Sequence, residues 1–541
     1  MDKVKQLDAV VVGAGFSGLY MLYRLREAGF TTRVYEAGDG VGGVWYWNRY
    51  PGARCDTESI HYCYTFSEEL YKEWTWSSRY PEQEELLSYL NYVADKFQLR
   101  SDIQLNTRVT KAHYDEELNR WMIYTNDGEI ISAKYFITGV GCLSTSNIPT
   151  FEGLDSFGGE WYHTGNWPHE EVDFTGKRVG VIGTGSTGVQ IIPTIADEVK
   201  KLTVFQRTPQ YSVPANNYPY SAEFIQKTKS NFREIKQALI DSPAGFIVKE
   251  GLPSAIEDTP ENRDRVFEEA WEKGGVDFQF SYKDFTTNPH SNRTAVEFIH
   301  SKIKGIIDEQ GVAETLLPQY YYATKRPIKD SGYYETYNKE NVELVDVKSK
   351  PIIEITPKGI QTEKQEYELD SIIFATGYDA MTGALFKMDI RGRDGISLKQ
   401  KWKNGEKVQT YLGIANAEFP NMFMITGPES PSVLTNMLVS IQQHVEWISG
   451  ALQYARRNEI DLLEAKKEAE EGWSSHCADV ASKTLYVQTD SWYTGSNVVG
   501  KPRNFLIYLG GLKNYREICN KIAEKEYEGF SKTVMNTPTS I

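Results

Sequence analysis

Cysteines and long hydrophobic runs are scarce in this sequence. The five cysteines are Cys55, Cys63, Cys142, Cys477 and Cys519, an odd number without CxxC spacing. This pattern excludes a dithiol redox centre and a cysteine zinc site, and it favours a reducing cytoplasm. No apolar run approaches the ~18 residues that a membrane helix requires, so we expect no membrane span.

Basic residues are also fewer than acidic ones, with 59 Lys and Arg against 74 Asp and Glu. The net charge is −15 at pH 7, which argues against a nucleic-acid groove. No basic segment or cleavage site precedes the apolar run that begins at Leu7, so the start of the chain predicts folded structure rather than a removable signal. A chain of 541 residues is too long for one core, and we expect about two to four domains.

Two segments follow the order strand, glycine turn, helix, strand. The first, residues 7–36, places Gly13, Gly15 and Gly18 between an apolar run and a helical repeat of leucines. Such glycines let the backbone approach a pyrophosphate that rests on the helix N-terminus. Glu36 ends the second strand, where its carboxylate can accept hydrogen bonds from a ribose diol. The segment predicts a dinucleotide site.

The second segment, residues 177–208, repeats the arrangement with the opposite charge at its end. Its turn carries the glycines at positions 183, 185 and 188, and its last strand finishes "VFQRT". Arg207 and the Thr208 hydroxyl would bind a ribose 2′-phosphate that a carboxylate would repel. We therefore expect the second site to prefer NADP(H) to NAD(H). Two dinucleotide sites suggest FAD plus NADPH, a plan that several flavoenzyme classes share.

Six further strings narrow the choice of class. They are "GGVWYWNRYPGARCD" at 42–56, "FGGEWYHTGNWP" at 157–168, "ATKRP" at 323–327, "FATGYD" at 374–379, "GPESPSVLTNML" at 427–438 and "SWYTGSNVVGKPR" at 491–503. Together with the two glycine turns, they resemble the type I Baeyer–Villiger monooxygenases over essentially the whole chain. The 427–438 string is most similar to the phenylacetone monooxygenase branch.

The resemblance implies an α/β fold with two Rossmann-like dinucleotide-binding domains. Residues 221–325 are rich in charge and show helical periodicity, which predicts a helical insertion in the NADP domain. We expect the FAD-binding domain to comprise residues 1–150 and 380–541, and the NADP-binding domain residues 151–220 and 326–379.

The activity that the resemblance implies is oxidation of cyclic, aromatic or linear ketones to esters or lactones. In this family NADPH reduces FAD, dioxygen then gives a flavin peroxide anion, and that anion attacks the carbonyl; sulfoxidation is a possible side activity. Arg326 matches the catalytic cation and Asp56 the acid that holds it. Lys325 matches a contact of the NADP 2′-phosphate.

Further site residues follow from the same resemblance. We expect FAD contacts from Gly13, Gly15, Phe16, Ser17, Gly18, Glu36, Val44, Trp45, Asp56, Tyr62, Val109 and Met437. We expect NADP contacts from Arg54, Cys55, Asp56, Gly183, Thr184, Gly185, Ser186, Thr187, Gly188, Gln190, Arg207, Thr208, Lys325, Arg326 and Trp492. We expect a loop over the ketone to contain Pro431, Ser432, Val433, Leu434 and Thr435.

The histidines offer no competing chemistry. His163 lies in an expected loop, and the resemblance gives it a role in domain movement rather than proton transfer. No histidine pair has metal-ligand spacing, so we expect no metal site. The protein is expected to be a cytoplasmic monomer that uses a small-molecule ketone and dioxygen.

Three alternatives remain at this point. A flavin monooxygenase that hydroxylates nitrogen or oxidises heteroatoms shares both glycine turns, but it should lack the Trp167-Pro168 ending and the Lys325-Arg326 pair. A disulfide reductase would need a CxxC near the flavin. A nucleotide-binding redox sensor would bind FAD without ketone-dependent consumption of NADPH.

Overall fold

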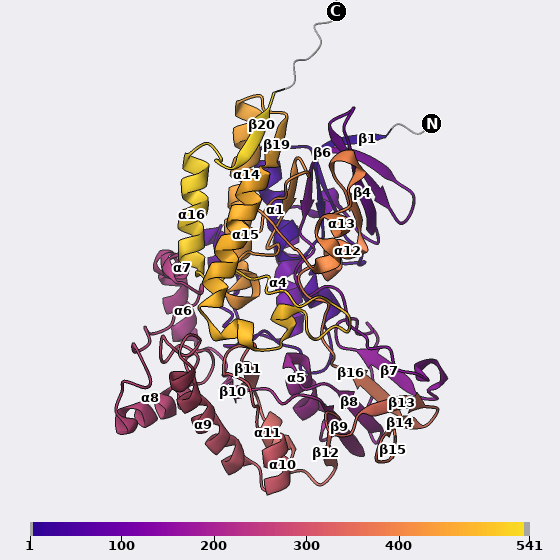
Figure 1. Cartoon of the computed structure of the whole chain (residues 1–541), viewed down its shortest axis with the longest axis vertical. Helices are drawn as coiled ribbons and strands as arrows, with labels where there is room; N and C mark the ends of the chain where they lie inside the picture. Colours follow the sequence, from indigo (N-terminus) through magenta and orange to yellow (C-terminus); the bar gives the residue numbers. More distant parts are fainter. Residues whose placement is uncertain (1–3, 535–541) are drawn as a thin grey trace, which may run out of the picture.

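The computed structural model describes residues 4–534 and contains two sheets with parallel cores, at opposite ends of the molecule (Figure 1). Among the described residues, the larger sheet has eight strands in the order β17-β4-β5-β6-β1-β2-β3, with β18 paired to β6. Its strands are β1 (Lys5–Val12), β2 (Thr32–Tyr35), β3 (Ile103–Gln104), β4 (Val109–Asp115), β5 (Arg120–Thr125), β6 (Ile130–Thr138), β17 (Asp389–Arg391) and β18 (Met422–Met424).

Helices from both ends of the chain cover this sheet (Figure 1). Because β1 is apolar on both faces and its last four residues are buried, it requires cover on each side. Helix α1 (Phe16–Glu27) packs against α14 (Met437–Arg457), which lies more than 400 residues later in the chain. The other helices of this half are α2 (Val44–Trp47), α3 (Glu68–Glu73), α4 (Gln83–Lys96), α12 (Gly383–Lys387), α13 (Leu398–Lys401), α15 (Lys467–Ser482) and α16 (Leu512–Glu524).

The smaller sheet has five parallel strands in the order β12-β9-β8-β16-β7 within the described part of the chain. They are β7 (Glu160–His163), β8 (Arg178–Ile182), β9 (Lys201–Gln206), β12 (Val342–Asp346) and β16 (Ser371–Phe374). Helix α5 (Ser186–Ile195) follows β8. A separate antiparallel sheet of β13 (Ile352–Thr356), β14 (Gly359–Thr362) and β15 (Glu366–Glu368) adjoins it (Figure 1).

A helical region lies partly beside the smaller sheet and partly against the half that contains the larger sheet (Figure 1). Its helices are α6 (Ala222–Ser230), α7 (Phe232–Asp241), α8 (Pro260–Lys273), α9 (Pro289–Ile306) and α10 (Gln310–Thr315). Ser221 and Thr259 cap α6 and α8 through their side chains, as the sequence favours. Strand β10 (Ser212–Pro214) precedes these helices in the chain and β11 (Ile328–Asp330) follows them. The two strands pair in parallel, and helix α11 (Tyr333–Thr336) comes after β11.

Both predicted strand–turn–helix–strand units are present in the structure. The α/β class and the two Rossmann-like units are confirmed. A separate two-stranded antiparallel pair joins β19 (Leu462–Ala465) to β20 (Phe530–Thr533). The exact domain boundaries stay a prediction. Within residues 4–534 no helix combines the length and apolarity needed to cross a membrane, and no group of His, Cys, Asp or Glu could hold a metal ion.

Candidate functional site

A cavity of about 2450 Å³ connects the two glycine turns. The first turn follows β1 and the second follows β8, so both lie at the carboxyl ends of inner strands, where open α/β sheets bind ligands. Residues of the helical region, including Asn292 and His300, also line it. One cavity is therefore in contact with all the regions that the sequence predicted to hold cofactors.

Both turns fit a pyrophosphate. The N-caps of α1 and α5 are Gly15 and Gly185, with no side-chain cap and no acidic residue in the first turn, so free backbone N–H groups and a positive helix end remain available. A Cβ at Gly18 or Gly188 would collide with the carbonyl oxygen of Gly13 or Gly183, whereas Gly185 faces open space. Gly18 and Gly188 thus permit the tight turn without lining the cavity.

Glu36 lies buried beside the first turn, as the sequence predicted. Its carboxylate accepts hydrogen bonds from the backbone N–H of Ala14 at 2.7 Å and of Gly38 at 2.8 Å. Burial raises the pKa of Glu36 above its ordinary value, although these hydrogen bonds favour the charged form. The side chain is therefore held toward the place where a ribose would lie against the turn.

Aromatic side chains border the same part of the cavity. The Trp45 indole nitrogen donates to the Tyr62 hydroxyl at 3.4 Å, and Tyr62 meets Phe16 edge to face. Val44, Val109 and Met437 line the cavity as well. These aromatic rings pack edge to face and, with the aliphatic side chains, give the cavity an apolar border that suits a large planar ligand.

The second turn ends in an unneutralised pair of cations. Arg207 and Lys325 both line the cavity, and neither forms a salt bridge with a described carboxylate. The Lys325 ammonium lies over the Tyr320 ring, 4.4 Å from its centroid. Burial, with Arg207 nearby, lowers the pKa of Lys325 to about 8. Two like charges placed together with Thr208 fit a phosphate dianion.

Arg326 and Asp56, which the sequence predicts to act together in catalysis, are in direct contact. Arg326 donates through Nη2 to Asp56 Oδ1 at 2.7 Å and through Nε to the other carboxylate oxygen. Burial alone would lower the pKa of Arg326, but Asp56 raises it, so the guanidinium stays charged. Conversely, burial would raise the pKa of Asp56, but Arg326 holds it below its ordinary value. The Arg326 side chain is 27% exposed, so it faces the cavity rather than lying fully buried.

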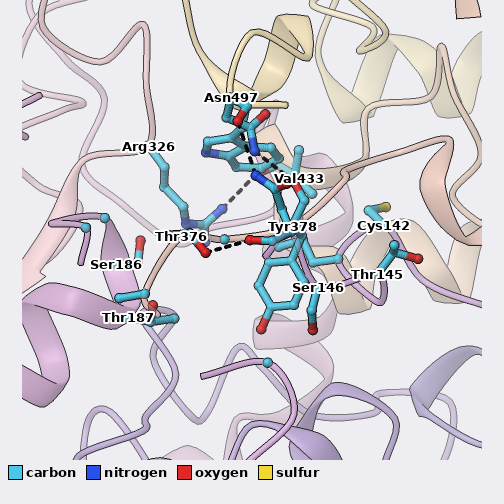
Figure 2. Close-up of a pocket in the computed structure, with 18 of the residues that line it drawn as sticks. Cys142, Thr145, Ser146, Ser186, Thr187, Arg326, Thr376, Tyr378, Val433 and Asn497 are labelled. Atoms are coloured by element: carbon cyan, nitrogen blue, oxygen red, sulfur yellow. Dashed lines mark hydrogen bonds between the residues drawn. The ribbon is translucent and has the colours of Figure 1, made fainter. Parts of the chain in front are cut away.

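The predicted ketone loop reaches Arg326 through its main chain. Residues Ser432–Leu434 form a 3₁₀ turn, and the Val433 carbonyl accepts a hydrogen bond from Arg326 Nη1 at 2.8 Å. Figure 2 shows these two residues side by side in the pocket. Of the five loop residues, only Val433 lines the cavity; the other four, Pro431, Ser432, Leu434 and Thr435, do not. Ser432 makes a contact of 3.0 Å with Cys142, another lining residue.

Three of the expected NADP contacts, Arg54, Cys55 and Gln190, line the cavity and also make contacts within the protein. Gln190 on α5 accepts from the Tyr50 hydroxyl at 2.6 Å and donates to the Arg54 carbonyl at 3.0 Å. The Arg54 guanidinium pairs with Glu82 at 2.7 Å, and the buried Cys55 has its pKa raised by burial. The Gln190 contacts tie the segment that carries Asp56 to the helix that follows the second glycine turn.

One prediction about His163 is wrong. The residue ends strand β7 rather than lying in a loop, and it is buried. Burial lowers the pKa of His163 to about 4, so the ring is neutral near pH 7. Its Nδ1 accepts from the N–H of Gly165 at 2.9 Å, and its Nε2 lies 3.4 Å from the Thr376 hydroxyl. A neutral, fixed ring agrees with the expectation that it is not the base.

The sequence did not predict a set of cavity-lining contacts between the segment after β16 and the segment that contains Trp492. Asn497 donates to the Tyr378 carbonyl at 2.8 Å, and its own carbonyl accepts from Asn147 at 3.2 Å (Figure 2). These contacts hold the segment of Trp492, which also lines the cavity, against the chain after β16. The strings "FATGYD" and "SWYTGSNVVGKPR" contain Tyr378 and Asn497, but neither string alone indicates that the two segments meet.

The comparisons with known proteins address the family. The flavin-binding monooxygenase-like family matches residues 5–244. The chain is 45% identical to a Baeyer–Villiger monooxygenase of Pseudooceanicola batsensis, over 96% of this chain and 95% of that protein. It belongs to the Baeyer–Villiger monooxygenase family. The chain is similar in structure to the NADP⁺-bound cyclohexanone monooxygenase of Rhodococcus sp. Phi1, with a TM-score of 0.96 and 45% identity over 98% of this chain and all of that chain.

A family relative with a different named activity is nearly as similar. A phenazine N-monooxygenase of Lysobacter antibioticus is 42% identical over 97% of this chain and 96% of that protein. Similarity over the whole length of the chain establishes the family. It does not establish the branch, so the assignment to the phenylacetone monooxygenase branch stays a prediction.

Proposed function

We propose that the protein oxidises ketones, whether cyclic, aromatic or linear, to esters or lactones, with sulfoxidation as a side activity. NADPH and dioxygen are the co-substrates and FAD is the bound cofactor. One oxygen atom enters beside the carbonyl carbon and the other leaves as water, while NADPH becomes NADP⁺. The observation that carries the proposal is the Arg326 cation, which Asp56 and the Val433 carbonyl hold at the cavity shared by both glycine turns.

The two dinucleotides are assigned to the two turns. The Gly13–Ser17 turn, Glu36 and the Trp45–Tyr62 pair would hold FAD. The turn at 183–187, with Arg207, Thr208 and Lys325, would hold NADPH, and Trp492 would pack on it. When bound, FAD would take up the reducing equivalents of NADPH and activate dioxygen, which is the source of the inserted oxygen atom.

The chain itself supplies charge and orientation. Negative charge develops on oxygen as the ketone carbon is attacked, and a fixed guanidinium stabilises that charge without reorganising. Arg326 suits this role because its N–H groups keep one plane and its charge persists at all working pH values. Asp56 occupies two of the nitrogens and Val433 a third, which sets the plane relative to the cavity.

Oxidation of a ring nitrogen is the second candidate, favoured by the likeness to the phenazine N-monooxygenase. Such chemistry needs an electrophilic oxygen donor, whereas attack on a ketone carbon needs a nucleophilic one. Purified protein is reduced with NADPH without air, then exposed to air with a ketone panel, a sulfide and a phenazine. Esters or lactones support the proposal, and N-oxide without any ester would replace it.

The proposal extends to the location, the oligomeric state and the ketone preference of the protein. The low cysteine content and negative net charge favour a cytoplasmic monomer. The 427–438 string favours larger ketones of the phenylacetone type. Sedimentation of the purified protein tests its oligomeric state, and the ketone panel tests the branch.

A further inference from the structure

The segment before Val433 has an unusual backbone. Three residues other than glycine, Thr426, Glu429 and Ser432, adopt positive φ angles of 55°, 66° and 42°. Left-handed backbone favours glycine, so other residues keep it only where surrounding contacts impose it. The contacts of Glu429 account for the centre of this segment.

The Glu429 carboxyl is buried and bound by neutral groups. The residue is 6% exposed, and its Oε2 accepts from the Thr410 N–H at 2.8 Å, the Thr410 hydroxyl at 3.0 Å and the Ser474 hydroxyl at 2.8 Å. Within residues 4–534 it has no salt-bridge partner. The other titratable groups that face it are Glu470, itself paired with Lys401, and the Cys477 thiol.

The main chain of Glu429 is fixed as well. Its N–H donates to the Leu506 carbonyl at 2.7 Å, and its carbonyl accepts from the Trp473 indole at 3.1 Å. Ser430 then forms a bridge with Ile507. Thus one residue ties three separate parts of the chain together, four positions before the carbonyl that receives Arg326.

We propose that Glu429 is a positioning residue: its carboxyl anchors residues 429–433, so that the Val433 carbonyl holds Arg326 in its working orientation. Glu429 does not line the cavity, so it acts through Val433 and not on the ketone or a cofactor. The positive φ at this position favours glycine, and the buried site favours an apolar side chain. A carboxyl group suits neither condition, so its function here is to accept the three hydrogen bonds from Thr410 and Ser474. The proposal rests on the proposed ketone oxidation only for its effect on turnover.

The test compares two substitutions at this position with a matched control. Glu429→Gly removes the acceptor and keeps a residue that fits the backbone, whereas Glu429→Gln keeps an acceptor oxygen. Glu418→Gly makes the same change at a similar φ of 67°, at an exposed residue outside the loop. For each FAD-loaded variant, three quantities are measured: ester formed per NADPH, the rate of anaerobic reduction by NADPH, and hydrogen exchange at Leu434 and Thr435, whose N–H groups bond within the loop.

The expected pattern is specific to the loop. Glu429→Gly should lower ester per NADPH by about tenfold, less than the ~100-fold cost of a ~1 Å misplacement because the remaining loop contacts still hold Val433 in part, and it should raise hydrogen peroxide. It should also speed exchange at Leu434 and Thr435 without slowing reduction by NADPH. Glu429→Gln should restore most of the ester yield, and Glu418→Gly should match the unmodified protein.

Two measurements can contradict the proposal. If Glu429→Gly shows unchanged ester yield and unchanged exchange at Leu434 and Thr435, the proposal is wrong. If this variant does not fold, Thr410→Val and Ser474→Ala, which remove the hydroxyl donors, take its place with the same expectations. If the unmodified protein forms no ester, the proposed function fails, while the exchange measurement still decides whether Glu429 anchors the loop.

Discussion

Arg326 and Asp56 lie 270 positions apart in the chain and form a two-point pair, with Nη2 to Oδ1 at 2.7 Å and Nε to Oδ2. Two contacts fix the plane of the guanidinium, where one would only fix its distance. Because Asp56 precedes the helical region and Arg326 follows it, the pair also joins distant parts of the chain at the cavity.

Replacement of Asp56 by Asn should keep the size of the side chain but loosen this pair. We expect ester formed per NADPH to fall by about tenfold or more, because the cation is no longer oriented. Asp197→Asn, which removes an exposed partner of Lys339, serves as the control and should behave as the unmodified protein. Equal ester yields in the two variants would show that Arg326 does not need Asp56.

Replacement of Arg207 by Ala should reduce the preference for NADPH over NADH. The loss of charge-assisted hydrogen bonds to the 2′-phosphate should amount to about 1.5–3 kcal/mol. Steady-state kcat/KM for the two cofactors measures this preference. Arg178→Ala, an arginine of the same sheet that pairs with Asp370, should leave the ratio unchanged. An unchanged ratio in Arg207→Ala would remove Arg207 from the phosphate site.

The affinity for NADPH should depend on pH through Lys325. Burial and Arg207 lower the pKa of Lys325 to about 8, so the ammonium is charged below that pH and loses its proton above it. Affinity for 2′,5′-ADP should therefore fall as pH rises through 8, while affinity for 5′-ADP, which lacks the 2′-phosphate, should change little. Calorimetric titration measures both. Lys325→Arg should abolish the dependence; if it persists there, another group is responsible.

The free energy of unfolding should depend on pH through Glu429. Burial raises the pKa of Glu429 to about 7 from the ordinary value of 4.5, so the folded state binds this proton more tightly than the unfolded state. Its contribution is complete below pH 4.5 and is lost as pH rises through 7, by up to about 3 kcal/mol. Denaturant unfolding of the unmodified protein and of Glu429→Gln at several pH values measures this contribution, as the difference between their free energies of unfolding. Parallel pH curves would contradict the assignment.

The sequence predicted the features that depend on the order of neighbouring residues along the chain. Glycines between a buried strand and a helix predicted both turns. The charges of Glu36 and Arg207 could be placed because each directly follows a neighbouring parallel strand. The Arg326–Asp56 pair followed from a family resemblance, since nothing local links residues so far apart in the chain.

Contacts that depend on long-range packing could not be predicted. The Val433 carbonyl that receives Arg326 carries no side-chain signal, and the contact of Asn497 with Tyr378 joins two loops of irregular backbone. His163 was expected in a loop because its string is rich in glycine and aromatic residues, but pairing with β16 makes it the end of a strand. The left-handed Glu429 is likewise set by Thr410 and Ser474, which no local pattern brings near.

The most direct test of the account is product analysis of Arg326→Ala. The variant should still bind FAD and be reduced by NADPH, because neither glycine turn involves Arg326. With air and a ketone that the unmodified protein converts, it should form hydrogen peroxide and no ester, because the negative charge on oxygen loses its fixed counter-charge. Ester at the yield of the unmodified protein would contradict the account.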